Sequence, residues 1–392
     1  MKKFLIVILI AVLSFCSCGV QEQSKIIVNK EEAKFVGVWM NYNEIGDLLS
    51  DVKDDNELIL KINSILDVFL EYKVNNVFLH TRAFDDAFYR SEIFKLSKYS
   101  FNSNNEFIDF LSIFISCAHK KDLKVHAWIN PYRISNQNDV ELIDPVSYAG
   151  KILSSNPNDE RVIICNNGMY YNPIYIDIQN YIISGVKEIV ENYSVDGIHF
   201  DDYFYPTTET SIDKIFYEKY ISSGGKLSLE DLRRNAVNSL VSSVYLLCKQ
   251  NSIVFSISPS ANISKNFNDN FASVEQWITE YGYVDFIIPQ MYYGFLNEAI
   301  PFDKCIEEWS KFNKNDKIIL GLALYKSGIV DEYALSGKNE WIENNNIIAR
   351  QIQISNNYEF LGVAYYSASY LYKQNKISQL EKENILNVVK DW

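Results

Sequence analysis

Short apolar runs alternate with amphipathic segments along most of the chain. Eight runs rich in Val, Ile, Leu, Phe and Ala are found at 35–41, 76–82, 124–130, 195–200, 253–259, 284–293, 317–325 and 360–367. Nearly continuous apolar runs of this length are typical of strands in a parallel sheet that is covered on both faces. Between them, apolar residues recur three and four positions apart, which predicts helices at 56–72, 106–121, 177–193, 229–250, 271–281, 303–312, 345–356 and 377–389.

Eight alternating strand–helix units predict fold class α/β, with a single (β/α)8 TIM barrel over 34–392. A long loop follows the third strand, roughly over 134–176. Loops of that length in compact domains are usually functional or disordered. The rival fold is an open doubly wound sheet, which usually has a glycine-rich phosphate-binding loop after its first strand. Residues 41–44 are Asn-Tyr-Asn-Glu, which disfavours that rival.

The first residues predict a lipoprotein-type signal peptide over 1–18. Lys2 and Lys3 precede an apolar run over 4–13, which is too short for a membrane span and typical of a signal-peptide core. Ser17 precedes Cys18, and a small residue before a cysteine resembles the lipobox of bacterial lipoproteins. Cys18 is therefore the candidate lipidated residue and 19–33 a polar tether. An ordinary secretory signal or a short N-terminal anchor stays open. The expected location is the bacterial cell envelope, periplasmic or surface-exposed.

The amino-acid composition indicates which classes of ligand the chain is expected to bind. The chain has 37 Lys and Arg against 50 Asp and Glu, a net charge of -13, which argues against binding nucleic acid. Its 27 Tyr and 23 Phe favour a sugar ligand, since aromatic faces in a cleft stack on sugar rings, although most must pack in the core. Neither a cofactor nor an oligomer is indicated. The cysteines outside the signal region are Cys117, Cys165, Cys248 and Cys305. They lack metal-type spacing and predict free thiols, with one disulfide left open.

Polar side chains gather at one end of the predicted strands. Catalytic residues of a (β/α)8 barrel come from the C-terminal strand ends and the loops after them. Those positions hold Asn41, Glu44, His80, Arg82, Asp85, Asp86, His126, Asn130, Arg133, His199, Asp201, Asp202, Ser258, Ser260, Gln290, Tyr292, Tyr325, Lys326, Tyr366 and Ser367. A single buried histidine is more often a hydrogen-bonded core group than a catalyst. Three histidines on consecutive strands indicate one pocket.

The fourth strand carries the densest candidate chemistry. His199 and Asp201 share one face by the two-residue period of a strand. Asp202 follows directly, and Pro206 ends the segment. An unpaired buried carboxylate is expensive, so two of them at one strand end indicate a functional site. The alternative is that these aspartates cap the next helix or pair with an arginine.

Several motifs resemble the glycosyl hydrolase-like family 10 of bacterial envelope proteins. They lie, in family order, at 37–39, 80–87, 126–133, 171–173, 196–206, 256–259 and 289–292. The resemblance implies a (β/α)8 barrel, a lipoprotein or secreted location, and hydrolysis of glycosidic bonds, with peptidoglycan strands the favoured substrate. Asp85 stands where the family is expected to have a small residue, so Asp86 is the better family position.

Glycoside hydrolysis usually needs two carboxyl groups across the scissile bond. Asp201 is the first choice for nucleophile or base, and its segment also resembles the fourth strand of α-amylase-type barrels. Asp202 is expected to orient Asp201 or to bind a sugar hydroxyl, and it stays a candidate acid. The other candidate acids are Asp86, which is preferred, and Glu44, because the fifth and seventh strands end without a carboxyl group.

The residues expected to bind substrate come from five strands or the loops after them. They are His80, Arg82, His126, Trp128, Asn130, Arg133, His199, Tyr203, Gln290, Tyr292 and Tyr366. The candidate stacking platforms are Trp39, Trp128, Tyr203 and Tyr205, each of which could equally be barrel packing.

Two other classes of function stay open. One is a metal-dependent carbohydrate hydrolase or deacetylase, with the three strand histidines and the aspartates around a divalent ion. Imidazole and carboxylate suit zinc, but the paired histidine spacing of many metal sites is missing from the sequence. The other is a glycan-binding lipoprotein that binds without cutting.

Overall fold

The structure is a computed structural model that describes residues 34–165, 168–313, 317–373 and 377–392. The predicted signal peptide, Cys18 and the tether lie outside the described residues. Residues 34–392 form one compact unit. No helix within the described residues is long and apolar enough to cross a membrane.

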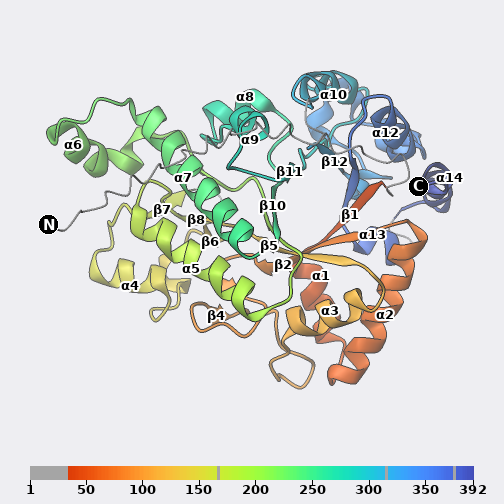
Figure 1. The fold of residues 1–392 in the computed structure, drawn as a ribbon, viewed down its shortest axis with the longest axis horizontal. Coiled ribbons are helices and arrows are strands. Elements are labelled where there is room, and N and C mark those ends of the chain that lie inside the picture. The colour runs from red at the N-terminus through yellow and green to blue at the C-terminus, as the bar shows by residue number, and fades with distance from the viewer. Residues whose placement is uncertain (1–33, 166–167, 314–316, 374–376) are drawn as a thin grey trace, which may run out of the picture. The chain divides into compact units, whose positions relative to one another are not determined.

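Eight parallel strands form a nearly closed barrel (Figure 1). They are β1 (Phe35–Met40), β2 (Asn76–Arg82), β5 (Lys124–Ile129), β9 (Gly197–Phe200), β10 (Val254–Ile257), β11 (Phe286–Ile287), β12 (Ile319–Leu322) and β13 (Gly362–Tyr366). Their order in the sheet is β11-β10-β9-β5-β2-β1-β13-β12. Parallel bridges from Ile287 to Ile318 and from Gln290 to Gly321 join the two outer strands. The predicted (β/α)8 barrel is thereby confirmed.

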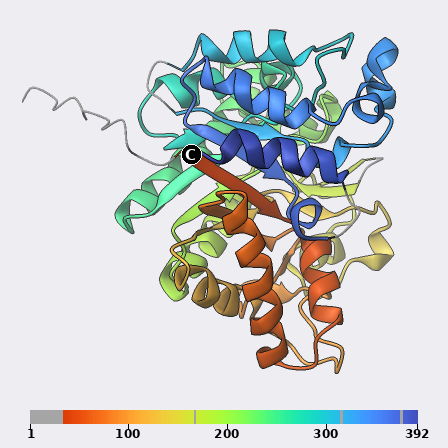
Figure 2. The same cartoon turned by 90° about the vertical axis from the view of Figure 1, so that its right-hand side faces the viewer.

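Helices surround these strands (Figure 2). The eight predicted helices correspond to α2 (Asp55–Glu71), α3 (Phe110–His119), α5 (Ile176–Asn192), α7 (Leu229–Gln250), α9 (Val274–Thr279), α10 (Phe302–Ser310), α12 (Ile347–Asn356) and α14 (Gln379–Val389). The apolar stripe of α2, which includes Leu58, Ile62 and Phe69, is buried, as its spacing predicts. α3 begins four residues later than predicted, because Asp109 caps it by accepting a hydrogen bond from the amide of Ser112.

Several elements were not predicted. Helix α1 (Tyr42–Ser50) follows β1 directly, and its N-terminus is a capping box made by Asn41 and Glu44. That pair has the spacing of a capping box, so the sequence did carry the signal. The long segment after β5 is ordered by a three-stranded sheet of β6 (Arg133–Ser135), β8 (Gly168–Tyr171) and β7 (Val162–Cys165). Helix α4 (Tyr148–Ser155) lies between β6 and β7 in the sequence.

The remaining elements within the described residues are short. They are β3 (Asp86–Ala87), β4 (Lys95–Leu96), α6 (Lys214–Ser222), α8 (Ile263–Asn268), α11 (Glu340–Glu343), α13 (Ser369–Tyr372) and four 3-10 turns. Cys117, Cys248 and Cys305 are buried thiols outside any disulfide.

The barrel interior has its own aromatic core, separate from the core between strands and helices. It contains Trp39, Phe78, Trp128, Phe286, Ile288, Ile319 and Ala364. Gly37 makes room for it, because a Cβ there would lie 2.8 Å from Phe78. Gly197 does the same for His126, whose Nδ1 would lie 2.4 Å from a Cβ. Burying one aromatic side chain stabilises a fold by about 1.5–3 kcal/mol. This core therefore gives the residues above it a rigid floor.

Candidate active site

Asp201 lies directly after β9, at the C-terminal ends of the barrel strands, which we call the mouth. The side chain is 4% exposed. Its Oδ2 accepts a 3.0 Å hydrogen bond from the indole nitrogen of Trp128, and its Oδ1 accepts one of 3.3 Å from the backbone amide of Tyr203. Trp128 pairs with His199 in the β5–β9 ladder, so side-chain alternation places Trp128, His199 and Asp201 on the same face of the sheet.

Burial raises the pKa of Asp201 to about 7, and the negative charge of Asp202 adds to that effect. The hydrogen bonds from Trp128 and Tyr203 and the charge of Arg133 act in the opposite direction. Burial also raises the pKa of Asp202, opposed by interactions with Gln290, Lys265 and Arg133. Two neighbouring carboxyl groups resist joint ionisation, so the pair tends to keep one proton.

His199 lies beneath Asp201 and is neutral. Its Nε2 is 3.0 Å from the indole nitrogen of Trp39, and its Nδ1 is 2.8 Å from the Ser256 hydroxyl. An indole N–H can only donate, so Nε2 is the acceptor and Nδ1 carries the proton. Burial lowers the pKa of His199 well below its usual value. Both ring nitrogens are therefore occupied by the protein.

His126 lies deeper in the barrel. Its Nε2 forms a 2.8 Å hydrogen bond with Oδ1 of Asn76, and its ring packs 4.8 Å from Phe78. Burial lowers its pKa to about 4, so it too is neutral at pH 7. In the described part of the chain, no three His, Cys, Asp or Glu side chains converge as metal ligands would.

His80 differs from the other two histidines because both of its ring nitrogens are buried without a partner. Its ring stacks on Trp128 with 3.7 Å between centroids and 9° between planes. It is 4% exposed, and neither ring nitrogen has a hydrogen-bond partner of ordinary geometry. Burial and the nearby Arg133 charge lower its pKa, with a weak opposing effect from the backbone of Arg82.

Arg82 and Asn130 hold the loops after β2 and β5. Arg82 is buried and donates to the carbonyls of Asn130 and Pro131 at 2.7 and 2.8 Å. It also pairs with Asp85 at 3.4 Å. Oδ1 of Asn130 accepts a hydrogen bond from the amide of Arg133. Both residues were predicted to bind substrate. The hydrogen bonds just given join them to other groups of the protein.

Asp85 completes this network through partners that the sequence analysis missed. The hydroxyls of Tyr171 and Tyr181 donate to it at 2.7 and 3.1 Å. Tyr171 belongs to the sheet inserted after β5, and Tyr181 belongs to α5. Their sequence distance from Asp85 left no local signal.

Arg133 and Tyr203 border the mouth. The Arg133 guanidinium lies 4.9 Å from the ring of Phe84 and 4.8 Å from the ring of Tyr203. Tyr203 is 38% exposed, so one aromatic face can meet a ligand beside Asp201. Trp39 and Tyr205 are instead buried in packing, Trp39 in the barrel interior and Tyr205 against Phe271.

Tyr292 and Tyr366 line the opposite part of the mouth. Their rings stack at 5.8 Å, and Tyr325, which was expected only as a polar strand end, meets each at 5.8 Å. Tyr366 also contacts the ring of Trp128 at 6.4 Å. Gln290 donates to the carbonyl of Ser258 at 3.0 Å and interacts with Asp202.

Glu44 is held by three donors. Its Oε2 accepts from the amide of Asn41, and its Oε1 accepts from the Ser367 hydroxyl at 2.6 Å and the Ser369 amide at 2.7 Å. It thereby ties the end of β1 to the end of β13. It also lines a hollow of about 260 Å³ together with Tyr325 and Tyr366.

Asp86 lies in β3 and lines another hollow. That groove has a volume of about 730 Å³ and also includes Phe84, Lys95 and Gln137, but not Asp201. The amide of Phe84 donates to Asp86 at 3.3 Å, and burial raises its pKa.

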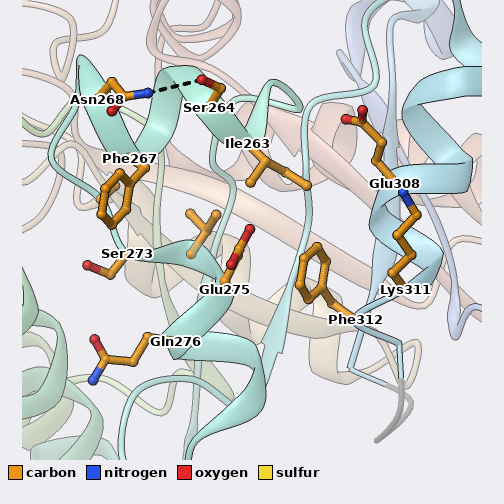
Figure 3. A pocket seen from close by; sticks show the side chains of 12 residues that line it. Ile263, Ser264, Phe267, Asn268, Ser273, Glu275, Gln276, Glu308, Lys311 and Phe312 are labelled. Carbon is orange, nitrogen blue, oxygen red and sulfur yellow. Dashed lines mark hydrogen bonds between the residues drawn. The ribbon is translucent and has the colours of Figure 1, made fainter.

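A further hollow of about 620 Å³ is lined by residues of α8, α9 and α10 and their flanking segments (Figure 3). Phe267, Phe312 and Ile263 give it an apolar wall, and Glu275, Glu308 and Lys311 are polar side chains around it. None of the predicted site residues lines it.

Comparison with known proteins decides the family. Residues 34–341 match the family model described as "Glycosyl hydrolase-like 10". The chain belongs to this family. Among curated members of known name, "Glycosyl hydrolase YngK" of Bacillus subtilis is 30% identical over 300 residues, which cover 70% of this chain and 57% of YngK. "Glycosyl hydrolase DigH" of Escherichia coli is 27% identical over 351 residues, covering 81% of this chain and 77% of DigH.

Solved structures share the barrel fold with this glycosyl hydrolase-like family 10 chain. The glycoside hydrolase domain of PgaB (BpsB) from Bordetella bronchiseptica aligns with TM-score 0.56 and 11% identity, covering 90% of this chain and 98% of that one. The catalytic domain of β-amylase from Paenibacillus polymyxa aligns with TM-score 0.56 and 9% identity, covering 91% and 98%. At these identities the likeness shows the fold alone.

Proposed function

We propose that this chain is a glycoside hydrolase that cleaves a polysaccharide at the barrel mouth. The observation that carries the proposal is Asp201, a buried carboxyl group that two donors hold in place beside an exposed tyrosine. Its pKa of about 7 means that both protonation states are populated near neutral pH. A group with such a pKa can give a proton to a leaving group and take one back from water.

The family supports a carbohydrate substrate, and the relatives YngK and DigH both carry the name glycosyl hydrolase. Aromatic rings at the mouth, among them Tyr203, Tyr292 and Tyr366, offer faces on which sugars stack. The predicted signal peptide and lipidated Cys18 would place the enzyme in the cell envelope. We therefore propose an envelope glycan as substrate, with peptidoglycan strands the favoured case.

The metal-dependent alternative is less well supported. It requires His80, His126 and His199 to share an ion, yet His199 uses both ring nitrogens on Trp39 and Ser256. His126 uses Nε2 on Asn76. A protein that binds a glycan without cutting it would have the same site geometry. Only a measurement of turnover separates it from a hydrolase.

The deciding experiment is a turnover assay on a soluble form starting near residue 30. It is incubated with peptidoglycan glycan strands, with and without stem peptides, and with a panel of other polysaccharides. Released reducing ends that vanish in Asp201→Asn and persist with EDTA establish a carboxylate glycosidase. Asp303→Asn, an exposed aspartate in α10, is the matched control and should keep turnover. Binding of one glycan without cleavage would replace the hydrolase with the binding protein.

A further inference from the structure

Most carboxyl groups at the C-terminal ends of the strands are already bound by other groups of the protein. Of the carboxyl groups at the described strand ends, Glu44 is held by Asn41, Ser367 and Ser369. Asp85 is held by Arg82, Tyr171 and Tyr181. Such contacts fix these groups as parts of the scaffold.

Other carboxyl groups that follow strand ends are also engaged by the protein. Asp213, after β9, pairs with Arg233, and Glu340, after β12, accepts hydrogen bonds from two backbone amides. Asp331, in the segment after β12, is buried and paired with Lys326 at 2.6 Å. Asp86 accepts a hydrogen bond from the amide of Phe84 and interacts with the side chain of Ser97. Among the described residues, this leaves Asp201 and the adjacent Asp202 as the carboxyl pair of the mouth.

The tyrosines of the mouth are poor substitutes for a second carboxylate. Burial raises the pKa of Tyr203 to about 12 and the pKa values of Tyr292 and Tyr366 above their ordinary range. They stay protonated at pH 7 and donate rather than attack. The nucleophile that attacks the anomeric carbon must therefore be a group other than these tyrosines and carboxyl groups.

We propose that the substrate supplies it: the enzyme takes a 2-acetamido-2-deoxy sugar whose own carbonyl oxygen attacks the anomeric carbon, with Asp201 as acid and base and Asp202 as the group that holds the acetamido N–H. This inference rests on the proposed glycosidase function. It assigns Asp201 the acid role, where the sequence favoured nucleophile or base.

The two steps balance with water as the only co-reactant. In the first, the acetamido oxygen bonds to C1, the bond from C1 to the leaving oxygen breaks, and that oxygen takes the proton of Asp201. The cyclic oxazolinium ion keeps its N–H against the Asp202 carboxylate. In the second, water attacks C1, the former acetamido oxygen leaves C1 with the electron pair of their bond, and Asp201 recovers the proton from water. The acetamido group is restored and the anomeric configuration is retained.

The anchoring of the two carboxyl groups suits these different roles. Asp201 is held on the β5 side by Trp128, whereas Asp202 interacts with Gln290, which follows β11. Asp201 is thus held from β5 and Asp202 from the segment after β11, so the two groups are anchored on different sides of the mouth. Asp202 is half-buried and can reach a ligand.

The charges of the pair agree with this assignment. The negative charge of Asp202 raises the pKa of Asp201. An ionised Asp202 therefore keeps Asp201 protonated to higher pH, as the first step requires.

The test uses one glycan with different N-acyl groups. De-N-acetylated chitopentaose and peptide-free peptidoglycan strands are re-acylated with acetyl, fluoroacetyl or trifluoroacetyl groups, and a free-amine sample is kept. Each fluorine withdraws electrons from the attacking oxygen. The expected kcat falls from acetyl to fluoroacetyl to trifluoroacetyl, and the free amine is not cleaved. NMR of the first product formed should show the retained anomer.

Asp202→Asn provides the second arm. We expect it to lower kcat on N-acetyl strands on the order of 10²-fold, with a smaller change in KM, because the lost charge stabilises the transition state. Asp303→Asn is again the matched control, and circular dichroism checks that each variant folds. If Asp202→Asn does not fold, the N-acyl series with the wild-type enzyme still decides.

The outcomes separate the two proposals. An inverted product, or a trifluoroacetyl strand cleaved as fast as the acetyl strand, overturns substrate participation and leaves the glycosidase in place. No cleavage of any N-acetylated glycan, together with turnover of a glycan without acetamido groups, also overturns it. No cleavage of any glycan in the panel overturns the proposed function itself and the inference with it.

Discussion

The indole nitrogen of Trp128 donates a 3.0 Å hydrogen bond to Oδ2 of Asp201. The two residues come from neighbouring strands, β5 and β9, and Trp128 itself is stacked on His80. The position of the carboxyl group is therefore fixed by the register of two strands and by a ring stack on a third. This contact also opposes the rise in the pKa of Asp201 that burial causes.

Trp128→Phe should move the pH dependence of turnover. The substitution removes a hydrogen bond that lowers the pKa of Asp201, so this pKa rises further. One hydrogen bond to a carboxylate is worth about 1.4 kcal/mol or slightly more, which corresponds to about one pKa unit. The limb of the kcat/KM profile that reports Asp201 should shift by about that amount to higher pH.

Trp39→Phe is the matched control for this shift. Trp39 is also a buried indole in the barrel, but it donates to His199 and not to Asp201. It should lower the melting temperature without moving the Asp201 limb. An unmoved limb in Trp128→Phe would show that this hydrogen bond does not set the pKa.

Asp201→Asn should change how stability depends on pH. The folded-state pKa of Asp201 is raised from 3.8 to about 7. The stability that this group contributes is therefore fully present below about pH 4 and is lost as pH rises through 7. Asparagine does not titrate, so the variant should gain stability relative to wild type between pH 5 and pH 8, at about 1.4 kcal/mol per unit at most.

Urea unfolding at pH 5 and pH 8 measures this difference. Asp303→Asn serves as reference and should show much the same offset from wild type at both values. If Asp201→Asn also kept a constant offset, the carboxyl group would have to ionise in the folded protein as it does in the unfolded chain.

Glu44→Gln should affect stability more than chemistry. One side-chain oxygen becomes an NH2 group that faces donors, either the Asn41 amide or the Ser367 hydroxyl and Ser369 amide. Leaving such buried groups unsatisfied costs about 1–3 kcal/mol. We expect a lower melting temperature, with kcat of the folded protein at 25 °C within a few-fold of wild type.

Ser367→Ala removes only one of these contacts and should give a smaller fall in melting temperature. A folded Glu44→Gln protein that has lost turnover to the same extent as Asp201→Asn would instead make Glu44 the general acid.

His80→Phe separates ligand binding from folding. Phenylalanine keeps a flat ring on Trp128, and His80 makes no ordinary hydrogen bond that the variant would lose. Because an unsatisfied buried polar group costs about 1–3 kcal/mol, the variant should be as stable as wild type or more stable. If a sugar hydroxyl pairs with His80, KM on the cleaved glycan should rise while kcat changes less.

His126→Phe is the contrasting variant, since it removes the hydrogen bond to Asn76. It should lower stability. If His80→Phe lowered the melting temperature as much as His126→Phe and left KM unchanged, His80 would be a packing residue.

The sequence alone determined the architecture and the place of the chemistry. Apolar runs fixed the eight strands, because a strand covered on both faces must be apolar throughout. Asp201 could be placed at a strand end facing inward from the two-residue period of 197–201, and the motif at 196–206 indicated the family. The capping box of Asn41 and Glu44 was also readable, although its helix was not predicted.

Only the tertiary structure decided which polar residues are available. Glu44 and Ser367 meet across 323 positions of sequence, and Asp85 meets Tyr171 across 86. Hydrogen-bond partners that lie so far apart in the sequence leave no pattern along the chain. The sequence therefore could not separate the polar residues that are bound within the protein from those that are available to a ligand. Closing the barrel gives Asp85 and Glu44 their partners, places Asp86 in the groove with Phe84 and Lys95, and brings Asp201 into hydrogen-bond contact with Trp128.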